Sequence, residues 1–252
     1  MKVVSLNTWG GKAGTDGLLA FLKRHDDVDI FCLQEVFDGG EEMRGRPAGR
    51  FALENFDPKL FERIGRALPG YKAHFRPQLR DFFGLALFAR EEIPIAEEGE
   101  VYIYREKGHV PSGNIADHSR TLQYVTLDEP KCSVMHVHGL WNGKGKLDCD
   151  ERIEQSARIL SFLRGQDRPF VLLGDFNLRP DTESIRMLED AGLRNLIREH
   201  GIETARTSLY DSREKEPHAN YAFVSEDIDV KEFKVLPDEV SDHAPLYLEF
   251  SV

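Results

Sequence analysis

The nine residues Pro169-Phe170-Val171-Leu172-Leu173-Gly174-Asp175-Phe176-Asn177 are the most informative stretch of this sequence. Four apolar residues after a proline predict a short strand that is buried on both faces. Asp175 and Asn177 follow two positions apart, and in an extended segment this spacing places both side chains on one side. A carboxylate beside a carboxamide suits water activation, metal ligation or phosphate binding. Asp and Asn are also common in turns, so this stretch alone fits an ordinary turn equally well.

The composition of the whole chain limits the class of protein. With 252 residues, 40% of them hydrophobic, the chain can bury a sizeable core. No apolar run approaches the roughly 20 residues of a membrane span, and the first residues read as a strand and not as a signal peptide. Cys32, Cys132 and Cys149 have no metal-type spacing, and the first two lie in apolar runs that predict buried free thiols. We therefore expect a cytoplasmic, monomeric protein that does not enter the membrane.

The net charge of −11 argues against a broad grip on duplex nucleic acid, which normally requires a basic surface. An acidic total can still contain a local basic patch. Arg44, Arg46 and Arg50 cluster in the long connection 38–56 and are candidates for contact with an anion. The alternative is that these three arginines are solvated surface charges.

Alternating and continuous apolar patterns predict an α/β chain. Strands are expected at 2–8, 29–36, 71–75, 82–89, 93–104, 120–127, 131–138, 169–173, 220–224, 230–235 and 244–250, and helices at 15–25, 58–68, 148–164 and 182–191. No repeat, low-complexity tract or linker divides the chain. We therefore expect a single domain over residues 1–252.

Polar side chains recur where predicted strands end. They are Asn7, Glu35, His138, Asp175 with Asn177, and Asp242 with His243. Because the ends of neighbouring strands meet at one edge of a sheet, these residues predict a carboxylate-rich pocket with two imidazoles. Such a pocket suits a hard divalent cation with acid and base groups beside it. A carboxylate such as Glu35 inside an apolar run is costly unless it is paired or bound to a metal.

Two alternative chemistries fit the sequence poorly. His136 and His138 share one face of their strand, but two histidines without a third ligand or a cysteine pair do not make a zinc site. We expect one functional histidine with a structural neighbour. The absence of a Gly-x-Ser-x-Gly elbow argues against a serine hydrolase.

Together, these segments resemble the endonuclease/exonuclease/phosphatase superfamily. The matching segments are Leu6-Asn7-Thr8-Trp9, Leu33-Gln34-Glu35-Val36, Gly174-Asp175-Phe176-Asn177 and Ser241-Asp242-His243-Ala244-Pro245, with Gly84 to Phe88, Arg120 and Arg152-x-x-Gln155 in consistent places. Each motif is weak, but all of them in order are specific, and the resemblance covers essentially the whole chain. It implies a four-layer α/β sandwich with two mixed β-sheets face to face and helices outside.

The resemblance also implies an activity, hydrolysis of a phosphodiester or phosphomonoester by in-line attack of water with Mg²⁺ (or Mn²⁺). By position, the metal would be held by Asn7, Glu35 and Asp242. Asp175 would orient or deprotonate the water, Asn177 and His243 would act at the phosphate, and His138 would face the scissile phosphate. Arg120 would join the arginine cluster in binding a phosphate-ester substrate, with nucleic acid, nucleotides, inositol phosphates and lipid head groups all left open.

One position departs from the family pattern. Relatives usually place an Asp before Tyr-x-Phe-Val-Ser, where it orients the active-site histidine, and this chain has Asn220. Asn220 can still accept a hydrogen bond from the ring, but it supplies no negative charge to favour an imidazolium. A catalytically weak or inactive relative that acts as a binding module is therefore the alternative function. Chance motifs in an unrelated α/β protein are the remaining alternative.

Overall fold

The computed structural model describes residues 1–48, 51–210 and 216–252 and contains two six-stranded sheets packed face to face. The first sheet has the order β13-β14-β1-β2-β6-β5, formed by β1 (Lys2–Asn7), β2 (Ile30–Phe37), β5 (Tyr71–Leu79), β6 (Phe83–Arg90), β13 (Asp229–Val235) and β14 (Leu246–Ser251). The second sheet has the order β11-β12-β10-β9-β8-β7, formed by β7 (Ile95–Tyr104), β8 (Arg120–Leu127), β9 (Cys132–His138), β10 (Phe170–Asp175), β11 (Arg194–Asn195) and β12 (Asn220–Val224).

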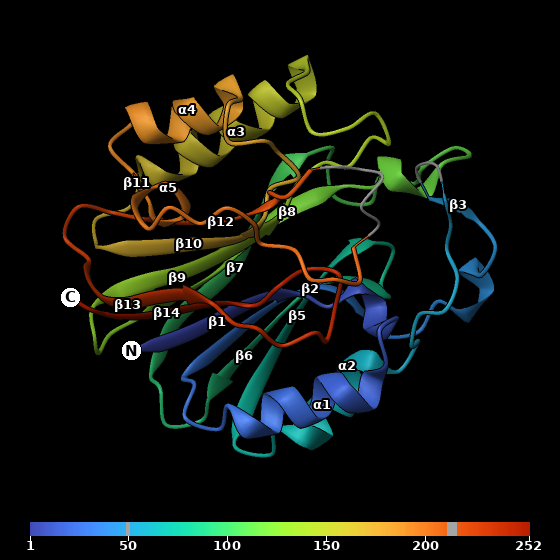
Figure 1. Cartoon of the computed structure of the whole chain (residues 1–252), viewed down its shortest axis with the longest axis horizontal. Coiled ribbons are helices and arrows are strands. Elements are labelled where there is room, and N and C mark those ends of the chain that lie inside the picture. Colours follow the sequence, from blue (N-terminus) through green and yellow to red (C-terminus); the bar gives the residue numbers. More distant parts are fainter. Residues whose placement is uncertain (49–50, 211–215) are drawn as a thin grey trace.

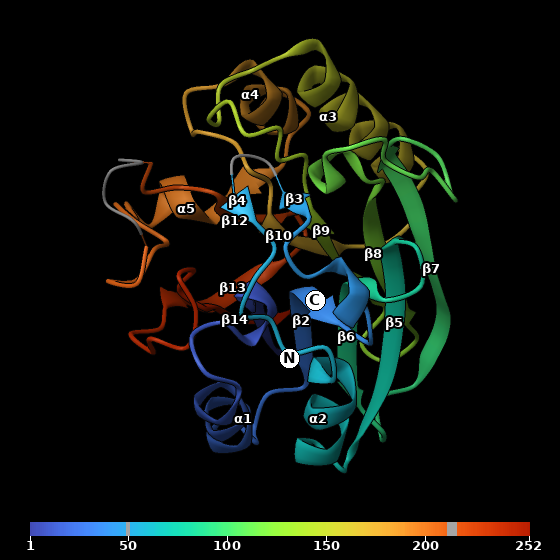
Figure 2. The same cartoon turned by 90° about the vertical axis from the view of Figure 1, so that its right-hand side faces the viewer.

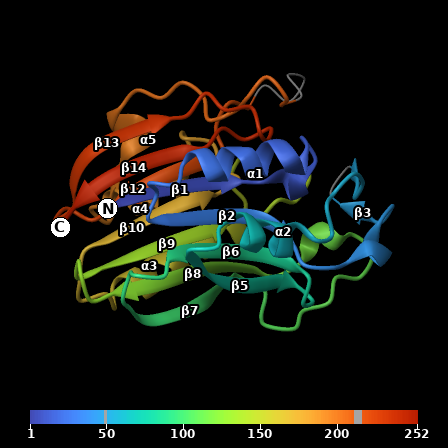
Figure 3. The same ribbon diagram turned by 90° about the horizontal axis from the view of Figure 1, so that it is seen from below.

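Helices cover the outer face of each sheet, which confirms the predicted α/β sandwich. Figures 1 and 3 show α1 (Thr15–Arg24) and α2 (Leu60–Ala67) against the first sheet. On the other side, α3 (Asp150–Leu163) and α4 (Glu183–Asp190) lie over the second sheet, and the short α5 (Leu196–Glu199) follows β11. No helix within the described parts of the chain is long and apolar enough to cross a membrane.

The apolar runs are continuous because the strands are buried on both faces. In β1, Val3 belongs to the core between the sheets, whereas Val4 and Leu6 pack with the helices α1 and α2. A side chain is therefore apolar whichever way it points, and the alternation that marks a half-exposed strand disappears. Cys32 and Cys132 are buried and unpaired, as predicted.

The carboxyl ends of the parallel strands meet at one end of the sandwich. Strand β1 runs parallel to β2 in the first sheet, and β9 runs parallel to β10 in the second. Both chain termini lie at the opposite end (Figure 1). Figure 2 looks onto the carboxyl end, where the connection 38–56 contains two short antiparallel strands, β3 (Pro47–Ala48) and β4 (Phe51–Ala52), that the sequence did not predict.

Candidate active site

A cavity of about 470 Å³ opens at this carboxyl end of the sandwich. Seven of its lining side chains are predicted site residues, namely Glu35, Arg120, His138, Asp175, Asn177, Asp242 and His243. They come from both sheets and from the loops that follow their strands, so the expectation of a single sheet edge was too simple. Two facing sheets can surround a ligand, whereas one edge can only border it.

Asn7 ties the two sheets together beneath the cavity. Its side chain is fully buried, and its Nδ2 donates to Glu35 Oε1 and to Asp175 Oδ2, each at 3.0 Å. The Asn7 amide oxygen accepts from the backbone N–H of Trp9 at 2.9 Å, which assigns the orientation of the amide. In this arrangement Asn7 orients both carboxylates through its N–H groups. Its predicted role as a metal ligand would need the oxygen that already accepts from Trp9.

A β-bulge turns Glu35 into the cavity. The register of β2 against β6 shifts between Leu33 and Val36, and Glu35 has a positive φ of 56°. Leu33 and Val36 both pack on the helix side. Gln34 and Glu35 therefore share the inter-sheet side, where strict alternation would send Glu35 to the helices. A bulge of this kind re-aims a side chain at a functional site.

Asp175 and Asn177 reach the cavity through a turn. Gly174 has a φ of 129°, and a Cβ there would lie 2.2 Å from the carbonyl oxygen of Val137, so only glycine fits. Asn177 has a φ of 54°, and its backbone N–H donates to Asp175 Oδ1 at 2.9 Å. The extended geometry assumed from the sequence is therefore wrong at Asn177. An Asx-type turn brings the two side chains together instead.

His243 lies between Asn220 and two carboxylates. Its Nδ1 is 2.6 Å from Asn220 Oδ1, and its Nε2 is 3.5 Å from Asp175 Oδ2 and 3.9 Å from Asp242 Oδ1. An amide oxygen can only accept, so Nδ1 carries the proton and Nε2 is the acceptor in the neutral ring. The departure at Asn220 thus keeps the contact with the histidine but lends the ring no charge.

His138 is held between Arg120 and Glu35. The Arg120 guanidinium is 3.0 Å from His138 Nε2, and that nitrogen lies 3.6 Å from Glu35 Oε1. Arg120 is 2% exposed and also donates to the backbone oxygen of Ala116 at 3.3 Å. A buried guanidinium donor beside the ring favours a neutral imidazole.

With this geometry in place, sequence comparison identifies the family. Residues 4–243 match the family described as the Endonuclease/Exonuclease/phosphatase family. This chain belongs to that family. No curated protein sequence matches the chain significantly.

Solved structures support the same fold across the whole chain. The mannosyl-6-phosphatase Bt3783 of Bacteroides thetaiotaomicron VPI-5482 superposes with a TM-score of 0.74 at 20% identity, covering 100% of both chains. The humanized D. rerio TDP2 gives 0.68 at 14% identity, covering 100% of this chain and 99% of that one. The human Nocturnin catalytic domain with bound sulfate gives 0.67 at 17% identity, covering 100% and 93%. Members of the Endonuclease/Exonuclease/phosphatase family are generally phosphoric ester hydrolases.

The carboxylates of this family member are crowded together. Burial raises the pKa of Glu35 to about 7, the Asn7 hydrogen bond opposes this, and the charges of Asp242 and Asp175 add to it. Burial also raises the pKa of Asp242, against the nearby charge of Arg206. Since each carboxylate disfavours ionisation of the next, the cluster is suited to a cation.

Burial and nearby positive charges lower the pKa of both imidazoles. Burial holds the pKa of His138 well below its usual range, and the positive charge of Arg120 adds to the effect. Burial lowers the pKa of His243 as well, followed by the charges of Arg206 and Lys146. The lowered pKa of each ring favours its neutral form.

The donor set partly fits a hard divalent cation. All the acidic groups present oxygen, and no thiolate lies among the lining residues of the described chain. Within those same residues, no three His, Cys, Asp or Glu side chains are arranged as a complete metal-binding group. Mg²⁺ commonly takes only one or two protein carboxylates and keeps several waters. Glu35, with Asp242 close by, is sufficient for that mode of binding.

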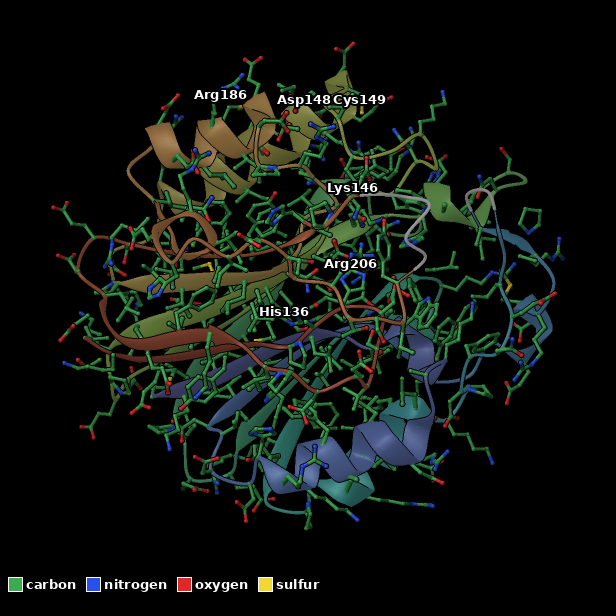
Figure 4. The ribbon with its side chains drawn as sticks, viewed as in Figure 1. His136, Lys146, Asp148, Cys149, Arg186 and Arg206 are labelled. Carbon is green, nitrogen blue, oxygen red and sulfur yellow. The ribbon has the colours of Figure 1, made fainter. Side chains whose placement is uncertain are left out.

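The remaining predicted residues have separate positions. His136 lies between the sheets, where it contacts Gln34 Nε2 at 3.1 Å and Gln123 Oε1 at 2.9 Å, so it is the structural neighbour that the sequence predicted (Figure 4). Arg44 and Arg46 are exposed and do not line the cavity. Arg50 lies outside the described residues. Substrate binding by these arginines stays a prediction.

The sequence did not predict two of the cations that line the cavity, nor the apolar part of its lining. Lys146 and Arg206 line the cavity, and their neighbour Tyr210 does too. The connections 38–56 and 105–119 supply apolar lining that includes Phe56 and Ile115. These residues lie in loops without periodic pattern, so composition and spacing carried no signal for them.

Proposed function

We propose that this chain is a divalent-metal-dependent phosphoesterase in which a water attacks phosphorus in line with the leaving alcohol. The single observation that supports this most strongly is the array joining Glu35, Asn7, Asp175 and His243 across the two sheets. It combines a metal-binding carboxylate, a second carboxylate and an imidazole within hydrogen-bonding reach of one small ligand.

The cation would be held by Glu35, with Asp242 beside it. When bound, a divalent cation supplies Lewis-acid stabilisation to a phosphoryl oxygen. The donor set favours Mg²⁺ or Mn²⁺ over Zn²⁺, since it lacks thiolates.

Residues of the chain supply the remaining steps. Asp175 orients the attacking water and accepts its proton as the new oxygen–phosphorus bond forms; as the ester bond breaks, the leaving oxygen takes a proton from solvent water and departs as the alcohol. Asn177 donates to a phosphoryl oxygen while the Asx turn holds it in place. Nε2 of neutral His243 accepts a hydrogen bond from the attacking water, His138 lies beside the transferring group, and Arg120 keeps the His138 ring in position.

A substrate panel tests the proposal. We would measure phosphate or alcohol release with Mg²⁺ and with excess chelator, on chromogenic mono- and diesters, abasic and single-stranded DNA, RNA, nucleotides, inositol phosphates, sugar phosphates and sphingomyelin. We expect turnover that chelator abolishes and that Asp175→Asn reduces by at least roughly 10²-fold. Asp181→Asn, which changes an exposed carboxylate paired with Arg179, is the matched control. Full activity in chelator would contradict the metal requirement, and no turnover on any substrate would favour the binding-module alternative.

A further inference from the structure

Two cations outside the sequence motifs, Lys146 and Arg206, line the cavity beside the same tyrosine. Lys146 is 2% exposed, and the side chain of Arg206 is 7% exposed. Lys146 comes from the loop between β9 and α3. Arg206 comes from the loop before β12, where its backbone forms an isolated antiparallel β-bridge with His243. Figure 4 shows both at the end of the sandwich where the strands finish, away from the central His136.

One tyrosine contacts both cations. The Arg206 guanidinium lies 4.1 Å from the centroid of the Tyr210 ring, and Lys146 Nζ lies 5.5 Å from the same centroid. Their positive charges also act on the same groups, since both lower the pKa of His243. Two like charges are thus held beside the residues that would surround a phosphate. Asp242 pairs with Arg206, whereas the charges of Asp175, Glu216 and Asp242 act on Lys146 from beyond ion-pair distance.

The hydrogen-bond partners of Lys146 and Arg206 within the described chain do not use all of their N–H donors. Arg206 donates to Asp242 at 3.2 Å, but its buried Nε has no hydrogen-bond partner within the described chain. Lys146 Nζ donates to the backbone oxygen of His218 at 3.1 Å, and no described carboxylate lies within ion-pair distance of it. A lysine ammonium has three N–H donors, so donors remain for a ligand.

The charge on the ligand distinguishes two substrate classes. A phosphomonoester carries about −1.5 to −2 at neutral pH and has three unesterified oxygens. A phosphodiester has one negative charge and two such oxygens. Two buried cations with free donors therefore match a terminal phosphate better than an internal one.

We propose that Lys146 and Arg206 bind the unesterified oxygens of a phosphomonoester and make terminal phosphates the preferred substrates. This inference rests on the proposed phosphoesterase function. Lys146 is the stronger determinant of the two, because Arg206 is already partly neutralised by Asp242.

The test compares two substrates with one leaving group, 4-nitrophenyl phosphate and methyl 4-nitrophenyl phosphate, in Mg²⁺. The wild type should have the higher kcat/KM on the monoester. Lys146→Met should lower kcat/KM on the monoester by roughly 10- to 100-fold, the value of a lost charge-assisted hydrogen bond, and on the diester by less than about threefold. Arg206→Gln should act in the same direction, and it carries the test if Lys146→Met does not fold.

Matched controls lie close by in the chain. Lys144→Met removes an exposed charge from the same loop, and Arg186→Gln removes an exposed arginine on α4, far from the cavity (Figure 4). Neither should change the ratio of monoester to diester activity. A wild type that prefers the diester would overturn the inference, and so would equal losses on both substrates.

A binding measurement separates failure of this inference from failure of the proposed function. Calorimetry with inorganic phosphate and with dimethyl phosphate, both in Mg²⁺, needs no turnover. If neither ester is hydrolysed, the proposed function fails. Tighter binding of inorganic phosphate that Lys146→Met weakens would still support the anion site, and equal binding of both ions would contradict it.

Discussion

His243 Nδ1 lies 2.6 Å from the Oδ1 atom of Asn220, and no carboxylate takes the place of that amide. The Nδ2 atom of Asn220 is buried without a partner in the described structure. The histidine is thus oriented by a neutral group, while burial and the charges of Arg206 and Lys146 keep its pKa well below the usual range.

Asn220→Asp should raise the pKa of His243, because an adjacent anion favours the protonated ring. The pH profile of kcat/KM, measured with saturating Mg²⁺, should then shift toward alkaline pH. If the acidic limb of the pH profile moves, the neutral His243 ring acts as a base. If the alkaline limb moves, the protonated His243 ring is the active form. Asn220→Ala should reduce activity without this shift. An unmoved profile in Asn220→Asp would show that the contact has no bearing on the titration.

Glu35 should destabilise the metal-free fold. Its pKa is about 7 in the folded chain against 4.5 as the ordinary value, so the folded state holds a proton that the unfolded state releases. Stability from this group is therefore fully present below about pH 4.5 and lost as the pH rises through about 7. In chelator at pH 8, Glu35→Gln should raise the free energy of unfolding by on the order of 1–3 kcal/mol.

In Mg²⁺ the wild type should become more stable than Glu35→Gln. Binding stabilises the wild type by mass action, and Glu35→Gln should lose most of this gain in Tm. Glu62→Gln, at an exposed position on α2, provides the control and should respond to Mg²⁺ like the wild type. Equal Mg²⁺ responses in Glu35→Gln and wild type would remove Glu35 from the metal site.

Lys146 should limit activity at alkaline pH. Burial and the charge of Arg206 lower its pKa to about 8, against the opposing charges of Asp175, Glu216 and Asp242. The ammonium is therefore lost as the pH rises through about 8, and kcat/KM on a phosphomonoester should fall there. Lys146→Arg keeps its charge and should move that limb to higher pH. Coincident alkaline limbs in the two proteins would contradict this assignment.

Gly174→Ala should be strongly destabilising, by roughly 2–5 kcal/mol, because the new Cβ would meet the Val137 carbonyl at a residue whose φ is 129°. Gly65, inside α2, has open space around the position of a Cβ. Gly65→Ala should therefore raise stability by about 0.5–1 kcal/mol. Denaturant unfolding of both variants measures the contrast, and similar effects in the two would contradict the packing at Gly174.

Much of the fold and of the site chemistry could be predicted from the sequence. The apolar run before Asp175 predicts a buried strand because burial on both faces leaves only apolar side chains tolerable. Asn7, Glu35, His138 and Asp242 could be selected because each falls at the end of a predicted strand, and polar groups at such positions are costly without a function. The element bounds differ from the predictions by a few residues, since helix and strand ends depend on local turns.

Other features depended on contacts between distant parts of the chain. The bulge that turns Glu35 inward arises from the pairing of β2 with β6, and the side chain of Asn177 donates to the distant backbone oxygen of Gly139 at 3.3 Å. Lys146 and Arg206 lie sixty positions apart in loops with no periodic pattern. The sequence by itself determined which strands form and which chemical groups are available, because those follow from local apolar pattern and residue type. Only the tertiary structure decided which groups meet, because the packing of two sheets against each other sets the distances between them.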